Sequence, residues 1–129
     1  MPIPTTKKRT TKRSTQKTMT LKIGHRDIDV SAMRDHDGPA HEMVGIFKRG
    51  HGIIEIDLQQ KPQEQGETLL HEVLHALVYD RNLSMVEDVE ERVVDTMAKA
   101  LCALIRDNPT FFDVIRSSLI DKKPLPLKD

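Results

Sequence analysis

The chain has no tryptophan, one tyrosine and three phenylalanines among its 129 residues. A hydrophobic core must therefore be built from Leu, Ile, Val, Met and Ala side chains. The single cysteine, Cys102, excludes an internal disulfide and suits a reducing compartment. The sequence also lacks an apolar run long enough to span a membrane and the apolar segment of a secretory signal. These absences predict a cytoplasmic protein that makes no membrane contact.

Positive and negative charges balance over the whole chain, with 20 basic and 20 acidic residues, but they are unevenly distributed. The first 20 residues contain no acidic residue and six basic ones: Lys7, Lys8, Arg9, Lys12, Arg13 and Lys17. Residues 1–19 have little to bury, so we predict a disordered basic tail. Such a tail is either a solvated arm or a weak contact for nucleic acid or another acidic surface.

Alternating apolar residues predict a small β-sheet in the first half of the chain. Leu21, Ile23, Ile28 and Val30 alternate with polar residues and indicate one or two short strands. Residues 35–42 resemble a loop. Two further apolar stretches, 43–48 and 53–58, flank a glycine-containing turn and predict a β-hairpin.

The second half of the chain is predicted to be helical. Pro62 opens a helix that runs to about Tyr79, and a second helix covers residues 86–106, with acidic residues in its first turns. Asn108-Pro109 ends the second helix, and Thr110 can cap a third that ends near Leu119. We therefore expect an α+β domain over residues 20–120, followed by a flexible end at 121–129.

The stretch HEVLH, His71 to His75, carries the clearest chemical signal. Residues four apart on a helix project from the same face, so both imidazoles can reach one cation, and neutral imidazole suits Zn²⁺. Glu72, beside the first histidine, can take a proton from a zinc-activated water, as in zinc hydrolases of the HExxH type. The bland alternative is a pair of solvent-facing histidines on a metal-free helical interaction domain.

A catalytic zinc ion needs a third protein ligand, and no third histidine follows at the spacing HExxHxxGxxH. The next helix instead opens with an acidic cluster that contains Glu90 and Glu91. The apolar stripe Val93, Met97, Ala100, Leu101 and Leu104 points toward Glu90. Asp95, one turn after Glu91, favours Glu91, because it can orient a ligand histidine. From the residues alone, both glutamates remain candidates.

The segments HEVLHALVYDRNL and VEERVVDTMAKALCALIRDNP resemble the small HExxH proteins of phages and prophages. These are minimal zincins related to the ImmA/IrrE-type and SprT-like metallopeptidases, and the resemblance covers about residues 40–110. Their ligand glutamate is followed by a small or aliphatic residue three positions on and by an apolar–Ala pair six and seven positions on. Glu91 matches this pattern with Val94, Met97 and Ala98, so the resemblance selects Glu91 over Glu90.

The resemblance implies a minimal zincin-like fold, with a small antiparallel sheet packed on the HExxH helix, a second long helix and a short C-terminal helix. It also implies that the strand Ile53–Asp57 forms the sheet edge beside the cleft, where peptide substrates add as an extra strand. Side chains that can stabilise the oxyanion are Tyr79, His51, His36 and His41, but no spacing selects one of them.

Two functions follow as hypotheses. The first is a zinc-dependent metallopeptidase, with Zn²⁺ on His71, His75 and Glu91 and with Glu72 as general base. The resemblance implies that such a protein is encoded by a phage or prophage. The alternative is a catalytically inactive zinc-binding phage protein that contacts DNA or a protein partner through its basic tail.

Overall fold

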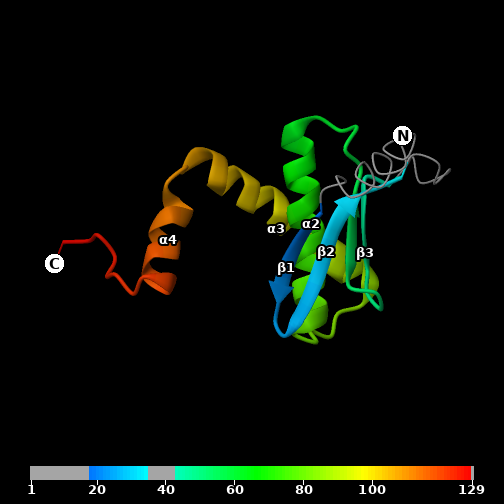
Figure 1. Cartoon of the computed structure of the whole chain (residues 1–129), viewed down its shortest axis with the longest axis horizontal. Helices are drawn as coiled ribbons and strands as arrows, with labels where there is room; N and C mark the ends of the chain where they lie inside the picture. Colours follow the sequence, from blue (N-terminus) through cyan, green and yellow to red (C-terminus); the bar gives the residue numbers. More distant parts are fainter. Residues whose placement is uncertain (1–17, 35–42, 129) are drawn as a thin grey trace, which may run out of the picture. The chain divides into compact units, whose positions relative to one another are not determined.

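The computed structural model of the chain describes residues 18–34 and 43–128. The six basic residues of the expected tail, the expected loop at 35–42 and the candidates His36 and His41 lie outside these residues. The chain divides into two compact units, one ending at Ser84 and the other beginning at Met85. Figure 1 labels most of the helices and strands of the described residues.

The first two strands form a hairpin, where alternation of apolar residues predicted strands. Strand β1, Met19–Ile23, pairs antiparallel with β2, Arg26–Ala32, so that Leu21 lies opposite Ile28. The turn between them contains Gly24 with φ of 64°, a conformation that glycine adopts without the steric penalty of a Cβ atom. The inward-facing residues Ile23, Ile28 and Val30 are buried.

The predicted second hairpin is present as β3, Gly45–Lys48, and β4, Ile53–Ile56, which pair antiparallel. β4 also pairs with β2, and this pairing is parallel, with Val30 opposite Ile54. The strand order is β1-β2-β4-β3, so the sheet is mixed rather than antiparallel as expected. The expectation that Ile53–Asp57 forms a sheet edge is therefore wrong, because β4 lies between β2 and β3.

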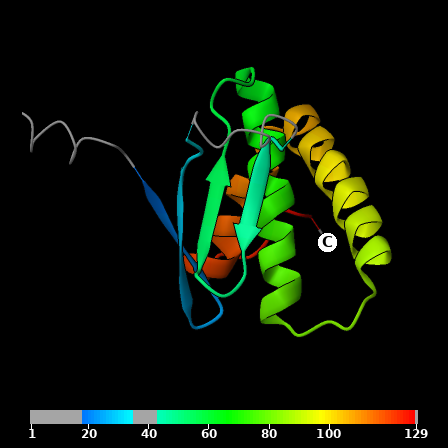
Figure 2. The ribbon, with the colours of Figure 1, turned by 90° about the vertical axis from the view of Figure 1, so that its right-hand side faces the viewer.

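Helix α2, Pro62–Asp80, packs against the sheet and contacts β3, β4 and β1. Figure 2 shows β3 beside this helix. At the start of α2, the backbone N–H of Lys61 donates to Oε1 of Glu64 at 3.1 Å, which satisfies a group that the helix itself leaves unpaired. Leu69, Val73 and Ala76 of α2 meet the sheet residues in one apolar core, whose other members are Leu21, Ile23, Ile28, Val30, Phe47, Ile54 and Ile56.

The second unit contains α3, Glu87–Asp107, and α4, Phe111–Ile120, close to the predicted bounds. Thr110 occupies the N-cap position of α4, but its side chain makes no capping hydrogen bond. On α3, Val94 and Ala98 are buried, whereas Val93, Met97 and Leu104 of the predicted apolar stripe are exposed. The buried face of α3 is therefore shifted by one residue from the predicted face.

The secondary structure places the chain in the α+β class, with a four-stranded mixed sheet and three helices in its described residues. Within that same part of the chain, no helix combines the length and the apolar composition that crossing a bilayer requires.

Candidate metal centre

The two histidines of HEVLH lie on consecutive turns of α2. Their imidazole ring centroids are 4.9 Å apart, with the ring planes inclined at 61°. Both residues are half-buried. This geometry follows from their spacing, because residues i and i+4 of a helix occupy the same face.

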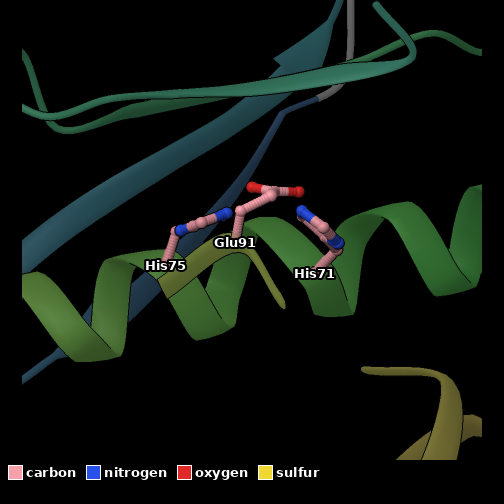
Figure 3. Close-up of side chains that lie close together, drawn as sticks. All are labelled: His71, His75 and Glu91. Carbon is pink, nitrogen blue, oxygen red and sulfur yellow. The ribbon is translucent and has the colours of Figure 1, made fainter. Parts of the chain in front are cut away.

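Glu91 of α3 completes a group of three possible metal ligands. One nitrogen of each histidine and one carboxylate oxygen of Glu91 all lie within 4.8 Å of one another. Figure 3 shows the carboxylate of Glu91 directed toward the two imidazole rings. Glu90, the rival candidate, is not a member of this group among the described residues, and it is buried. The group could hold a metal ion.

The donor set fits a divalent transition metal. Two imidazole nitrogens and one carboxylate oxygen form one of the ligand sets used by catalytic zinc sites, which keep a fourth position open. Zinc bonds of about 2.0–2.1 Å in a tetrahedron place ligand atoms roughly 3.3 Å apart. The ligand atoms of His71, His75 and Glu91 lie within 4.8 Å of one another. The kinds of side chain in this group are therefore ones that zinc can use.

Glu72, the predicted general base, is buried at 8% exposure between α2 and the neighbouring strand β3. A Cβ atom added at Gly45 of β3 would come within 3.2 Å of the Cγ atom and 3.3 Å of the Oε2 atom of Glu72. The same atom would come within 2.5 Å of the methyl group of Thr68, one turn earlier on α2. The backbone of β3 therefore touches the helix at Glu72 because position 45 carries no side chain.

Strand β3 is an edge strand of the sheet in the described residues, and α2 contacts it. The N–H of Asp57 donates to the carbonyl oxygen of Val44 at 2.8 Å. Since hydrogen-bonded pairs alternate along antiparallel strands, Ile46 also faces β4 through its backbone groups. The backbone N–H and C=O groups of Gly45 and Phe47 consequently face the outer edge of the sheet.

The remaining candidates from the sequence are placed differently. Tyr79 lies one turn beyond His75, where its ring meets Phe47 edge-on at 5.9 Å between centroids. His51 is exposed in the β3–β4 turn, and its backbone N–H donates to the carbonyl oxygen of Lys48 at 3.1 Å. Asp95 accepts a hydrogen bond from Nζ of Lys99 at 2.8 Å. The role of Asp95 in orienting a ligand histidine stays a prediction.

Two features of this region were missed at the sequence level. The first is the close approach of Gly45 to Glu72, for which a glycine inside a predicted strand was the available signal. The second is the position of Arg26 over the Tyr79 ring, with its Cζ atom 4.7 Å from the ring centroid. Nothing in the sequence connects these two residues, because they come from different elements.

No known protein family, curated protein or solved structure matches the chain. What the chain does is therefore inferred from its own side chains.

Proposed function

We propose that the chain is a zinc-dependent metallopeptidase, in which His71, His75 and Glu91 hold the ion and Glu72 is the general base. The observation that carries this proposal is the convergence of the three ligand atoms within 4.8 Å, with a buried carboxylate next to the first histidine. Zinc in a site with three protein ligands supplies an acidified water and a Lewis acid for the substrate carbonyl.

Glu72 accepts the proton from the attacking water and later delivers it to the amine that leaves. A carboxylate suits both steps because it is charged before the attack and protonated after it. Burial of Glu72 against Thr68 and Gly45 restricts its rotamers, so the carboxylate is held in place before the substrate binds.

The substrate class that this geometry favours is an extended peptide. The outward-facing backbone groups of Gly45 and Phe47 can pair with a peptide strand, which would pass directly beside Glu72. The edge strand β3 thus takes the position that we first expected for β4. Backbone pairing holds the peptide without regard to its sequence, and it leaves alternate side chains to meet the surface of the unit.

The test is a comparison of Glu72→Gln with Glu64→Gln in zinc-loaded protein. Both change a glutamate of α2 to its uncharged isostere, but Glu64 is exposed and caps the helix through an oxygen that glutamine retains. We expect Glu72→Gln to keep stoichiometric zinc and to lower peptide cleavage about 10²- to 10⁴-fold, the usual range for a general acid–base group. Glu64→Gln should cleave like the wild type.

Digestion of a complex peptide mixture, followed by mass spectrometry of the new termini, provides the assay. Equal cleavage by the wild type and Glu72→Gln would contradict the role of Glu72. Stoichiometric zinc with no cleavage by the wild type would support the alternative of a zinc-binding protein without peptidase activity.

A further inference from the structure

Two arginines converge on one tyrosine at the end of the first unit. The Cζ atom of Arg26, at the start of β2, lies 4.7 Å from the ring centroid of Tyr79. The Cζ atom of Arg49, in the β3–β4 turn, lies 6.0 Å from the same centroid. Phe47 meets this ring edge-on. These four residues are called the Tyr79 cluster below.

The Tyr79 cluster lies in line with the candidate metal centre. Tyr79 is four residues beyond His75 and eight beyond His71 on α2, so the three side chains follow one face of the helix. β3 follows the same direction, since Gly45 touches Glu72 and Phe47 touches Tyr79. With a strand rise of about 3.3 Å per residue, the two β3 positions are about 7 Å apart. A peptide paired with β3 therefore passes Glu72 and reaches the Tyr79 cluster two residues later.

The two arginine side chains of the cluster reach the solvent. Arg26 and Arg49 are both exposed. Among the acidic residues of this region, Asp27 follows Arg26 and is exposed, whereas Glu55 and Asp80 have cationic partners. Glu55 pairs with Nζ of Lys48 at 3.4 Å, and Asp80 lies 3.8 Å from Nε of Arg81 while its side chain packs against the turn at Gly24.

Contact with the tyrosine ring holds the guanidinium group of Arg26 in a position where it can meet a carboxylate. A guanidinium group over an aromatic face interacts through its flat side, whereas its N–H groups point outward in the plane. These in-plane donors match the two oxygens of a carboxylate, and less rotational freedom is lost when the contact forms. A second guanidinium group, that of Arg49, lies near the same ring.

We propose that the Tyr79 cluster is a substrate subsite that binds an acidic side chain, Asp or Glu, of the peptide, about two residues from the bond that is cleaved. This inference rests on the proposed function, because it assigns the substrate class of that same site. The bound carboxylate would contact Arg26 and Arg49, and the peptide backbone would pair with β3.

The inference is tested by binding, in zinc-loaded Glu72→Gln protein, so that the result does not depend on cleavage. The probes are fluorescent pools of random octapeptides in which one position is fixed as Glu or as Gln, and binding is followed by fluorescence polarisation. We expect the Glu pool to bind roughly three- to tenfold more tightly than the Gln pool at one or two fixed positions, the scale of a charged contact that is partly exposed.

Arg26→Gln combined with Arg49→Gln should abolish this difference between the pools. The matched control is Lys22→Gln combined with Arg34→Gln, which removes the same net charge from exposed positions of the same unit and should preserve the difference. Arg26→Glu should reverse the preference toward pools with Lys at the same fixed position. Glu and Gln pools that bind equally at every position, or an equal loss in the control, would overturn the inference.

Cleavage of the same pools by protein with an intact Glu72 decides the proposed function separately. Cleavage without any preference for Glu would leave the peptidase standing and remove the subsite. Tighter binding of the Glu pool without cleavage would retain the subsite for acidic peptides and remove the peptidase.

Discussion

Gly45 of the edge strand lies directly against Glu72, because a Cβ atom added at Gly45 would stand 3.2 Å from Cγ and 3.3 Å from Oε2 of that residue. The methyl group of Thr68 would be closer still, at 2.5 Å. Under the proposed function, this contact bears on how a substrate reaches Glu72. A peptide on the outer edge of β3 comes within reach of the proposed general base only if the strand approaches the helix this closely.

Gly45→Ala is therefore expected to separate β3 from α2 and to reduce peptide cleavage more than zinc binding. The new methyl group must displace Thr68 or the strand, at a cost of about 1–3 kcal/mol in the free energy of unfolding, typical of overpacking. Urea denaturation measures this cost, and zinc content and cleavage rate are determined on the same preparation.

Gly50→Ala is the control for this substitution, since no atom lies within 4 Å of a Cβ added there and its φ is not positive. Its cleavage rate should match the wild type. If Gly45→Ala cleaves peptides as fast as Gly50→Ala does, the close approach of β3 has no part in the reaction.

Most helix and strand positions could be predicted from local signals, but the sheet topology could not. Pro62 fixes the start of α2, and the glycines between β3 and β4 mark a hairpin. The parallel pairing of β2 with β4 involves residues far apart in sequence, and no turn signal encodes it. The expectation of an antiparallel sheet with β4 at its edge failed for this reason.

The candidate site, too, could be predicted from the sequence only in part. The spacing of His71 and His75 was sufficient to place both on one face of α2. Choosing between Glu90 and Glu91 was harder, because the predicted stripe of α3 included Val93 and Met97, which are exposed. The apolar residues of α3 occupy a broad arc of the helix, so periodicity alone did not select the buried part.

Substitution of Glu91 and Glu90 distinguishes the proposed zinc ligand from its neighbour. Glu91→Gln removes the charge of the proposed ligand at an exposed position. It should weaken zinc binding more than about 100-fold, because changes to residues that only support a ligand already cost up to about that much. Glu90→Gln changes a buried carboxylate and should lower the free energy of unfolding while zinc stoichiometry is kept. Competition with a chromophoric chelator measures both affinities. Loss of zinc in Glu90→Gln with retention in Glu91→Gln would reverse the assignment.

Truncation of Ile54 tests where the core of the first unit lies. Ile54 is fully buried in the interior strand β4, and it belongs to the cluster shared by the sheet and α2. Ile54→Ala should lower the free energy of unfolding by about 2–5 kcal/mol, because it leaves a cavity in a packed interior. Leu58→Ala, at a residue 56% exposed, should change it by less than about 0.5 kcal/mol, as is usual for surface positions. Similar losses for both variants in urea titrations would place the core elsewhere.

Removal of zinc should lower the thermal stability of the wild type and leave that of His71→Ala nearly unchanged. A metal that binds only the folded chain stabilises it by about 2.7 kcal/mol when the free metal concentration is 100 times the dissociation constant. His71→Ala loses one of the three ligand atoms, so little of this stabilisation remains for a chelator to remove. Differential scanning calorimetry with and without chelator, on both proteins, measures the two shifts.

The control is His25→Ala, which changes an exposed histidine in the β1–β2 turn outside the ligand group. This variant should respond to the chelator as the wild type does. An equal chelator response in the wild type and His71→Ala would mean that the stabilising metal is bound without His71.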